Sequence, residues 1–355
     1  MGEVGSVVMN RRIFKEQTSD SGDVPFYKIG TFGGSPDSFI SRELFEEYKN
    51  KYPYPKVGDI LISASGSIGR TVVYQGKDEY FQDSNIVWLE HDEQVDNSFL
   101  EQFYSVVKWK GLEGSTIKRL YNKNILDTDI SLPAIDEQQK IGVFFKHLDN
   151  TITLHQRKLD LLKQMKKGFL QKMFPKDDGK VPELRFADFI DEWEQRKLGE
   201  VTDVKSGRDY KHLNSGVIPV YGTGGYMLSV DEALSYDEDA VGIGRKGTID
   251  KPYILKAPFW TVDTLFYTLP NQEIDLNFIY AIFQNIDWKS KDESTGVPSL
   301  SKTTINKVNI SVPSKSEQQK IGDFFQQLDQ TITLHQEKLN KLKLLKKSYL
   351  QNMLI

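Results

Sequence analysis

The sequence predicts an α/β protein in which two mixed α/β domains are separated by two long helices, packed as an antiparallel coiled coil with pseudo-two-fold symmetry. Two observations predict this arrangement: a 45-residue block occurs twice, and each copy has the apolar spacing of a coiled coil. The 355 residues suffice for about two domains of ordinary size. Hydrophobic residues make up 38% and charged residues 27%, which favours folded domains over disorder.

The duplicated block is the strongest internal signal. Residues 130–174 and 310–354 align with an offset of 180 and no gap, and 28 of the 45 positions are identical. This period is far too long for a solenoid, so it indicates two copies of one unit, each a globular segment followed by a helix. We therefore expect four parts, which are two domains at residues 1–136 and 181–316 and two spacer helices at residues 137–180 and 317–355.

The helices are predicted by apolar residues that recur at alternating steps of four and three, the seam of a coiled coil. The seam of the first block is Ile141, Phe145, Leu148, Ile152, His155, Leu159, Leu162, Lys166, Phe169 and Met173. The seam of the second block is Ile321, Phe325, Leu328, Ile332, His335, Leu339, Leu342, Lys346, Tyr349 and Met353. We expect the two seam histidines to be packed or hydrogen-bonded polar residues rather than a metal pair.

Each helix starts shortly after a proline, Pro133 or Pro313, and about 38 residues at ~1.5 Å each give a rod of roughly 57 Å. Matching seams favour packing of the two helices on each other, in the antiparallel manner of a two-fold dimer joined into one chain. The alternative is that each helix docks on its own domain.

Strands and short helices are expected at matching places in the two domains. Residues 59–63 and 71–74 read as strands in the first domain, and residues 240–244 and 264–267 do so in the second. Gly-punctuated turns follow at 63–71 and 242–250, and we align Gly66-Ser67-Ile68 with Gly247-Thr248-Ile249. Short helices are expected at 98–110 and 277–288. Elsewhere the domains diverge, which suggests two domains of one kind that read different targets.

Composition and motifs argue against several classes of protein. The chain has no cysteine, which excludes disulfides and thiolate chemistry, and no apolar run is long enough for a membrane helix. The start of the chain lacks a signal-peptide pattern. The five histidines show no metal-ligand spacing, and no nuclease, methyltransferase or serine-nucleophile motif is present. GIGRKG at 242–247 lacks the spacing of a nucleotide-binding loop, so a strand–turn–strand hairpin is the better interpretation.

Charge gives no support for a nucleic-acid partner. The net charge is −4, and the two domains carry 15 basic against 21 acidic and 15 against 20 acidic side chains, respectively. A DNA-binding protein needs a basic face to displace counterions from phosphate, so such a face must come from local clustering or from a partner.

Basic and polar residues gather in the predicted loops of both domains and are the candidates for contact with DNA. In the first domain they are Lys28, Thr31, Ser65, Ser67, Arg70, Lys118, Arg119, Tyr121, Asn122 and Lys123. In the second they are Lys205, Arg208, Tyr210, Lys211, Tyr221, Thr223, Arg245, Lys246, Ser301, Lys302 and Thr303. The alternative is that each of these residues is an ordinary surface residue without a role in binding.

The duplicated block, with its EQQKIGxFF start, together with PELRFADFIDEWEQRKLGEV at 182–201 and the ending LQNMLI, resembles the specificity (S) subunit family of type I restriction–modification enzymes. The resemblance covers nearly the whole chain. It implies that the two domains are target recognition domains, that the helices set the gap between two half-sites, and that the subunit itself is not catalytic. It also implies an interface with helix and methyltransferase at Glu137, Gln138, Ile141, Phe144, Phe145, Leu148, Glu317, Gln318, Ile321, Phe324, Phe325 and Leu328.

The resemblance further implies the partners. They are double-stranded DNA with a bipartite, asymmetric site, two methyltransferase subunits that bind S-adenosylmethionine, and motor–nuclease subunits that use ATP and Mg²⁺. No cofactor, metal or membrane is expected for this chain, and a cytoplasmic location is. One departure concerns the segment before Gly199, which has no counterpart before Gly2. If its strand completes the second domain, we expect the first domain to be weakened.

Two other hypotheses belong to different classes. A stand-alone or fused restriction nuclease requires catalytic carboxylates, which the sequence does not place. A protein-interaction adaptor without any DNA role fits the acidic charge. Cleavage of plasmid with Mg²⁺ would identify the first, and failure to bind a bipartite duplex in the presence of the methyltransferase would favour the second.

Overall fold

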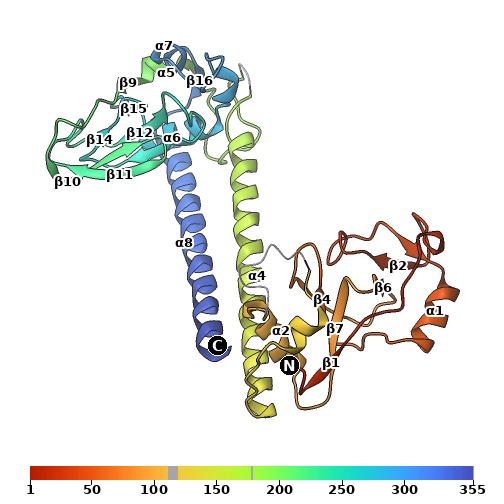
Figure 1. Cartoon of the computed structure of the whole chain (residues 1–355). Coiled ribbons are helices and arrows are strands. Elements are labelled where there is room, and N and C mark those ends of the chain that lie inside the picture. Colours follow the sequence, from red (N-terminus) through yellow and green to blue (C-terminus); the bar gives the residue numbers. More distant parts are fainter. Residues whose placement is uncertain (111–118, 177–178, 355) are drawn as a thin grey trace. The chain divides into compact units, whose positions relative to one another are not determined.

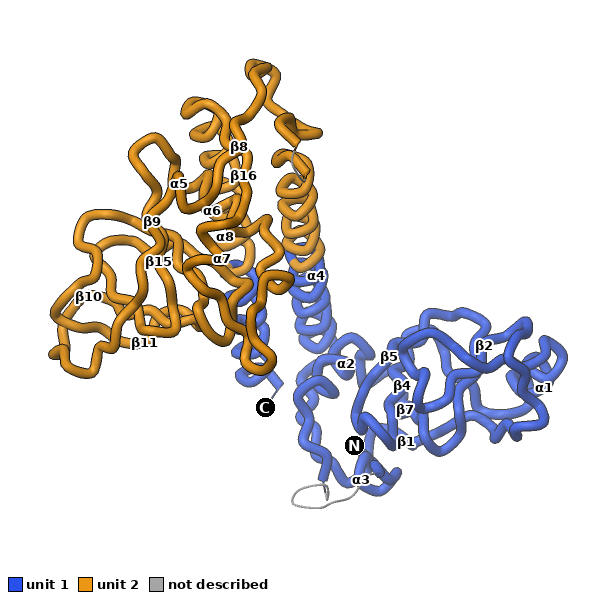
Figure 2. The backbone as a smooth tube through the Cα atoms, turned by 90° about the horizontal axis from the view of Figure 1, so that it is seen from above, with its two compact units in different colours: residues 1–155, 338–355 blue, residues 156–337 orange. Residues whose placement is uncertain are grey.

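The structure of the chain is a computed structural model, which describes residues 1–110, 119–176 and 179–354. It forms two compact units (Figure 2). Unit 1 comprises residues 1–155 and 338–355, and unit 2 comprises residues 156–337. Each unit therefore contains one globular domain together with a part of both long helices.

The two long helices are α4 (Ile135–Lys172) and α8 (Lys315–Leu354), labelled in Figure 1. They begin two residues after Pro133 and Pro313, close to where the repeat predicts. Seam residues are buried or half-buried along both helices, except Tyr349 and Met353, which are 37% and 42% exposed. Their counterparts Phe169 and Met173 lie in unit 2, where residues 180–193 follow and cover them.

Contacts inside each unit show that the helices pair in an antiparallel manner. In unit 1 the Lys346 ammonium lies 2.6 Å from the Asp149 carboxylate, and the rings of Phe144 and Tyr349 are 5.3 Å apart. In unit 2 the equivalent ion pair joins Lys166 to Asp329, and the rings of Phe169 and Phe324 are 5.0 Å apart. In both units, residues later in α4 contact residues earlier in α8. The two helices therefore run antiparallel, as predicted. The alternative in which each helix docks only on its own domain is wrong.

Unit 1 carries two small sheets and short helices. A four-stranded antiparallel sheet has the order β1-β7-β4-β5, and a three-stranded sheet has the order β3-β2-β6. The strands are β1 (Gly5–Val8), β2 (Val24–Tyr27), β3 (Phe39–Ile40), β4 (Ile60–Ser63), β5 (Thr71–Val73), β6 (Tyr80–Phe81) and β7 (Ile86–His91). The α-helices are α1 (Arg42–Lys51), α2 (Asn97–Val106) and α3 (Asn122–Leu126), and a 3-10 helix spans Lys15–Gln17.

Unit 2 repeats this plan with longer strands. Its sheets have the orders β13-β12-β15-β9, β11-β10-β14 and β16-β8. The strands are β8 (Glu194–Lys197), β9 (Thr202–Ser206), β10 (Ser215–Gly222), β11 (Gly225–Val230), β12 (Ala240–Gly244), β13 (Tyr253–Leu255), β14 (Trp260–Thr261), β15 (Leu265–Pro270) and β16 (Asn309–Val312). The α-helices are α5 (Leu198–Val201), α6 (Leu276–Asn285) and α7 (Lys302–Asn306), and a 3-10 helix spans Lys289–Lys291.

Helices α2 and α6 connect each domain to a long helix. Both start at an aspartate N-cap, Asp96 or Asp275, whose carboxylate accepts hydrogen bonds from the first free backbone N–H groups. Each long helix lies close to the short helix of its domain at a glycine. A Cβ at Gly142 would overlap Ser98 in unit 1, and a Cβ at Gly322 would overlap Asp275 in unit 2. The glycine of the repeated IGxFF motif is thus explained by packing.

The predicted elements of both domains are confirmed in type and place. The strands expected at 59–63, 71–74, 240–244 and 264–267 correspond to β4, β5, β12 and β15, and GIGRKG begins a β12–β13 hairpin. The helices expected at 98–110 and 277–288 end earlier, at Val106 and Asn285. The residues that follow, Val107 and Ile286, have non-helical backbone angles, so the chain leaves the helix at these positions.

Candidate nucleic-acid interface

The candidate interface of unit 1 is built around the turn between β4 and β5. Leu120 donates its backbone N–H to the Ala64 carbonyl at 2.7 Å, and Ser65 forms an isolated β-bridge with Arg119. Gly66 has a φ of 66°, a backbone conformation that glycine adopts at no steric cost. The turn is thereby tied to the segment that leads into α3, so the candidates Ser65 and Arg119, which are 54 positions apart in the sequence, become neighbours.

Unit 2 has the same construction between β12 and β13. Leu300 donates its backbone N–H to the Arg245 carbonyl at 2.9 Å, and Lys246 forms a β-bridge with Ser299. Gly247 has a φ of 95°. These contacts repeat those of Ala64, Leu120 and the neighbouring bridge, so the sequence alignment of residues 66–68 with 247–249 is confirmed. The backbone is shared, whereas the side chains differ.

Further loops of unit 1 join this turn. The Arg70 guanidinium donates to the Gly33 carbonyl at 3.1 Å, which ties the 28–34 loop to the hairpin. In that loop the Thr31 hydroxyl bonds the backbone of Lys28, whose ammonium lies 2.9 Å from the exposed Asp37. Ser67 is exposed at the hairpin tip. The predicted residues on these two loops are therefore brought together.

The segment before α3 completes the cluster in unit 1. The Arg119 guanidinium donates to the Ser84 carbonyl at 2.9 Å and lies 5.9 Å from the Tyr121 ring centroid. Tyr121 is 56% exposed, and Asn122 and Lys123 are exposed beside it. Lys118, also predicted, lies outside the described residues.

In unit 2 the candidates converge on the segment between β14 and β15. Arg208 donates its backbone N–H to the Thr261 carbonyl at 2.8 Å, and Arg245 donates its own to the Thr264 carbonyl at 2.8 Å. The Arg245 guanidinium lies 5.8 Å from the Phe266 ring centroid. Both arginine side chains are exposed, so two loops that are distant in the sequence each present an arginine beside the segment between β14 and β15.

The other candidates in unit 2 lie around this segment. Val262 donates its N–H to the Tyr221 carbonyl at 3.0 Å, so Tyr221 adjoins the cluster, while Thr223 lies in the turn between β10 and β11. Ser301 caps α7, with Lys302 and Thr303 exposed behind it. Tyr210 packs against the small core near β10 and β14, Lys211 is exposed, and Lys205 lies 3.7 Å from Asp203.

An acidic side chain shapes the turn in unit 2. Asp292 accepts hydrogen bonds from the backbone N–H groups of Ser299 and Ser294, both at 2.9 Å, and these bonds hold its pKa below the usual value for aspartate. The aspartate fixes the 292–299 loop and so presents Ser299 to Lys246. It is a positioning group rather than a contact for an anionic ligand.

Some polar residues of the cluster were not predicted. Gln82 accepts the N–H of Ile29 at 2.9 Å, and Asn85 accepts the Ser65 hydroxyl at 2.9 Å. Between them Ser84 has a φ of 53°. The sequence Asp83-Ser84-Asn85 between two strands is a turn signal that indicates this loop, but its closeness to Ser65 depends on the tertiary structure.

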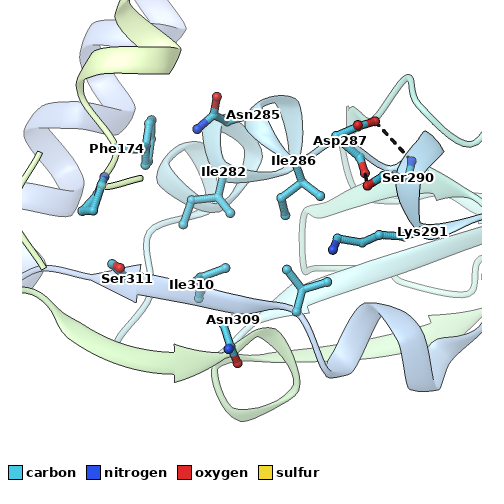
Figure 3. Close-up of a pocket in the computed structure, with 12 residues that line it drawn as sticks. Phe174, Ile282, Asn285, Ile286, Asp287, Ser290, Lys291, Asn309, Ile310 and Ser311 are labelled. Atoms are coloured by element: carbon cyan, nitrogen blue, oxygen red, sulfur yellow. Dashed lines mark hydrogen bonds between the residues drawn. The ribbon is translucent and has the colours of Figure 1, made fainter. Parts of the chain in front are cut away.

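The cavities do not compete with these loops as the site. One cavity of about 350 Å³ lies in unit 2 between α6 and β16 (Figure 3). Apolar side chains such as Phe174, Ile282 and Ile310 line it together with Asn285 and Asn309, and no DNA candidate does. Within residues 1–110, 119–176 and 179–354, no group of three or more His, Asp or Glu side chains is arranged to hold a metal ion.

The repeated block contacts its domains through a glutamine. In unit 1 the Gln138 amide accepts the Asp96 N–H at 2.9 Å and donates to the Pro133 carbonyl at 2.9 Å. In unit 2 Gln318 makes the equivalent bonds with Asp275 and Pro313, at 3.1 and 3.0 Å. Each glutamine thus locks the start of a long helix to the N-cap of the short helix of its domain.

The remaining predicted interface residues fall into two groups. Ile141, Phe145, Ile321 and Phe325 are buried, and Leu148 and Leu328 are half-buried along the helix seam. Glu137 and Phe144 are exposed, whereas their counterparts Glu317 and Phe324 are buried and half-buried, respectively.

Comparison with known proteins agrees with this architecture. The family model described as the type I restriction modification DNA specificity domain matches residues 1–164 and again residues 190–344. The chain therefore belongs to the family of type I restriction–modification DNA specificity domains, and it carries two of them.

Individual relatives carry similar names. A protein of Haemophilus influenzae, named as a proposed type I restriction enzyme specificity subunit, is 57% identical over 157 residues, which are 43% of this chain and 41% of that protein. The MjaVIII specificity subunit of Methanocaldococcus jannaschii is 22% identical over 354 residues, covering 88% of this chain and 81% of the relative. These names support the specificity-subunit hypothesis rather than the nuclease or the adaptor.

Solved structures show the same fold. The S subunit of the type I system of M. genitalium aligns over 100% of this chain and 94% of its own, with a TM-score of 0.67 and 19% identity. A chain from a structural study of type I complex assembly aligns with a TM-score of 0.54 and 15% identity over 99% of this chain and 95% of its own. Among the described residues, no helix combines the length and hydrophobicity required to span a bilayer.

Proposed function

We propose that this chain is the non-catalytic DNA-reading subunit of a type I restriction–modification enzyme, and that each domain reads one half of a bipartite, asymmetric DNA site. One observation carries the proposal: the two domains present the same hairpin turn on the same backbone contacts, with different side chains. A β-bridge joins Ser65 of the turn to Arg119 in unit 1, and Lys246 of the turn to Ser299 in unit 2. Readers built on one plan with different side chains suit two different half-sites.

We also keep the four-part division of the chain as part of the proposal. Residues 1–136 and 181–316 are the two target recognition domains, and residues 137–180 and 317–355 are the spacer helices. The long helices are stiff, and neighbouring base pairs are ~3.4 Å apart along the duplex, so their length sets the gap between half-sites.

The partners follow from the same proposal. Leu154 of α4 and Leu334 of α8 occupy equivalent positions of the repeat and are 64% and 65% exposed. Two equivalent apolar positions suit the docking of two methyltransferase subunits, which bind S-adenosylmethionine. Motor–nuclease subunits that use ATP and Mg²⁺ complete the enzyme in the cytoplasm. This chain needs no cofactor of its own.

The test is methylome sequencing of cells that express the chain with its methyltransferase. We expect methylated adenine in a two-part motif. Arg245→Ala should relax or abolish recognition of one half-site only, since Arg245 is exposed beside the turn of unit 2. Lys251→Ala, at an exposed lysine outside the predicted cluster, is the matched control. A continuous motif, or loss of both half-sites with Arg245→Ala, would contradict the proposal.

The ruler role has a separate test. Insertion of four residues after Leu154 adds about one helical turn, ~6 Å, to α4. The recognised gap should lengthen while both half-sites keep their sequence. An unchanged gap would contradict the ruler role. The nuclease alternative predicts that the purified chain cuts plasmid in the presence of Mg²⁺, and we expect no cutting.

A further inference from the structure

A basic stretch of α4 lies in unit 2 beside the second domain (Figure 2). Residues 156–172 carry six basic side chains and one acidic side chain. The domain itself, residues 181–316, carries 15 basic and 20 acidic side chains. A protein that reads DNA needs cations that displace counterions from phosphate. In unit 2 the helix therefore supplies positive charge that the domain lacks as a whole.

Three lysines of this stretch line a hollow between α4 and the second domain. Lys163, Lys166 and Lys167 form its α4 side, and the hollow has a volume of about 420 Å³. The domain contributes Asp250 and Pro252, which lie at the end of the connection between β12 and β13. That connection begins with two of the candidates for DNA contact. The hollow therefore adjoins the candidate interface of unit 2.

The two carboxylates that line the hollow are paired with lysines. Asp250 lies 2.8 Å from the Lys289 ammonium, which holds the pKa of this carboxyl below its usual value. Asp329 of α8 forms an ion pair with Lys166, and the same ammonium faces the Tyr280 ring. Both acidic groups are therefore neutralised within unit 2, which weakens their repulsion of an anion in the hollow.

The other two lysines of the hollow keep their charge uncompensated. The side chains of Lys163 and Lys167 are exposed. Within the part of the chain that the structure describes, neither forms an ion pair with a carboxylate, and Lys163 reaches the neutral Gln336 amide at 3.5 Å. The two lysines are four residues apart on one face of α4, so their Cβ atoms are separated by roughly 5–6 Å. This spacing brings both ammonium groups within reach of one phosphate or of two adjacent phosphates.

Apolar residues line the hollow next to these cations. Leu170 is buried, and Pro252 and Ile332 are half-buried. Cations beside apolar surface suit a ligand in which charged and carbon-rich groups alternate. The DNA backbone has this character, because a deoxyribose ring separates each phosphate from the next. A duplex bound at the hairpin after β12 would have backbone groups beside the hollow, since the two sites are connected by a few residues.

We propose that Lys163 and Lys167 bind the DNA backbone next to the half-site that unit 2 reads, with phosphate at the two ammonium groups and deoxyribose against Pro252 and Ile332. The inference rests on the proposed reading of DNA and adds α4 to the DNA-binding surface. It accounts for the acidic balance of the domain, because cations outside the domain displace the counterions. Phosphate contacts carry no base sequence, so these lysines raise affinity and leave the recognised motif unchanged.

The salt dependence of DNA binding tests the inference. The chain is assembled with its methyltransferase, and binding of a duplex that carries the methylated motif is followed by fluorescence anisotropy at about 50–300 mM KCl. In the double variant with Lys163→Gln and Lys167→Gln, the slope of log K against log salt concentration should decrease in magnitude by about 2, since each phosphate contact contributes ~0.9. The affinity at about 100 mM salt should fall at least about tenfold, with the same motif.

Lys158→Gln is the matched control. Lys158 is an exposed lysine of the same stretch, five residues from Lys163 and nine from Lys167. At ~100° per residue it lies about 140° and 180° around the helix from them, away from the hollow. The control should leave the slope unchanged. Glutamine retains helix propensity, so circular dichroism melting curves should be the same for all the variants.

A second measurement locates the contact. Single uncharged methylphosphonates replace one phosphate at a time on both flanks of the unit 2 half-site, which Arg245→Ala identifies. The unmodified chain should lose affinity when the substitution falls at one or two positions. The double variant should be insensitive at those same positions, because the charge that would pair with the phosphate is already absent.

An unchanged slope in the double variant would overturn the inference. So would an equal decrease with Lys158→Gln, which would assign the effect to overall charge, or equal sensitivity of both chains to every methylphosphonate. Loss of methyltransferase from the double variant, measured by mass photometry, would assign the hollow to an acidic surface of that protein instead. These results leave the bipartite motif, and with it the proposed function, intact. An unmodified complex that binds no bipartite duplex would overturn the proposed function as well.

Discussion

The two copies of the repeated block share most of their residues, but equivalent side chains differ in burial and in contacts between the two units. Glu317 is buried against Arg185 in unit 2, whereas Glu137 is exposed in unit 1. Phe324 meets the ring of Phe186, whereas Phe144 meets the rings of Phe145 and Tyr349 on the long helices. The difference lies in residues 180–197, which contact the start of α8 and which we call the covering segment. It shows that the energetic role of an identical side chain depends on what lies over it.

The hairpin turns of the two units show the opposite relation, in which the side chains differ and the backbone contacts are the same. The two hairpin turns that follow β4 and β12 have different side chains but keep the same backbone bonds, from Leu120 to Ala64 and from Leu300 to Arg245. A backbone frame held by hydrogen bonds leaves the exposed side chains free to vary, because their replacement breaks no main-chain contact. Duplication followed by divergence at such positions yields two readers on one scaffold.

The largest expected effect comes from breaking the buried ion pair. Arg185→Ala should lower the free energy of unfolding of unit 2 by about 3–5 kcal/mol, because it leaves the Glu317 carboxylate buried without its partner. Glu137→Ala, at the equivalent exposed position, should change stability by less than about 0.5 kcal/mol. Urea denaturation followed by tryptophan fluorescence measures both.

The double variant with Arg185→Ala and Glu317→Ala sharpens this comparison. It should recover part of the lost stability, since no unpaired charge remains buried. Equal losses for Arg185→Ala and Glu137→Ala would mean that the covering segment does not distinguish the two copies.

A graft should transfer the property of unit 2 to unit 1. Residues 182–197 placed directly before Met1 should cover the exposed Glu137, Lys140 and Phe144. The melting temperature of unit 1 should then rise by about 5 °C, which corresponds to roughly 2 kcal/mol for a unit of this size. Differential scanning calorimetry measures the shift.

The same graft with Arg185→Glu and Trp193→Ala is the control, and it should give little or no increase. An equal increase with both grafts would attribute the effect to the added length rather than to the specific contacts.

The smallest effects are expected at the two Asp–Lys ion pairs between the long helices, which occupy equivalent positions in the two units. The Asp149–Lys346 pair has side chains that are 40% and 21% exposed, and those of the Asp329–Lys166 pair are 31% and 13% exposed. Double-mutant cycles to alanine should give coupling of about 0.5 kcal/mol in unit 1 and about 1 kcal/mol in unit 2, because the second pair is less screened by water.

A stronger coupling in unit 1 than in unit 2 would contradict this order. Replacing all four residues with leucine should leave the helices paired but weaken the preference for one register, since a polar seam pair specifies alignment at a cost in stability. Size-exclusion chromatography with light scattering would detect the resulting association of chains.

The sequence predicted a large part of the fold and less of the site. Alternating four- and three-residue steps located α4 and α8, since a coiled-coil seam is a local periodic pattern. Glycine-punctuated runs located the hairpins, and their alignment through Gly66 and Gly247 was confirmed. The helices after β7 and β15 were predicted too long, because the apolar pattern continues past Val107 and Ile286, whose backbone angles are non-helical in the structure.

What the sequence determined by itself is whatever a local or repeated pattern encodes: the duplication, the two rods and their seams, and the loops that carry cations. The tertiary structure alone decided which of these residues meet. It joined Arg119 to Ser84 and Arg208 to Thr261, and it buried Glu317 against Arg185 while Glu137 is exposed. The physical reason is that burial and pairing depend on segments distant in the chain, and a side chain's own sequence neighbours do not record which segment covers it.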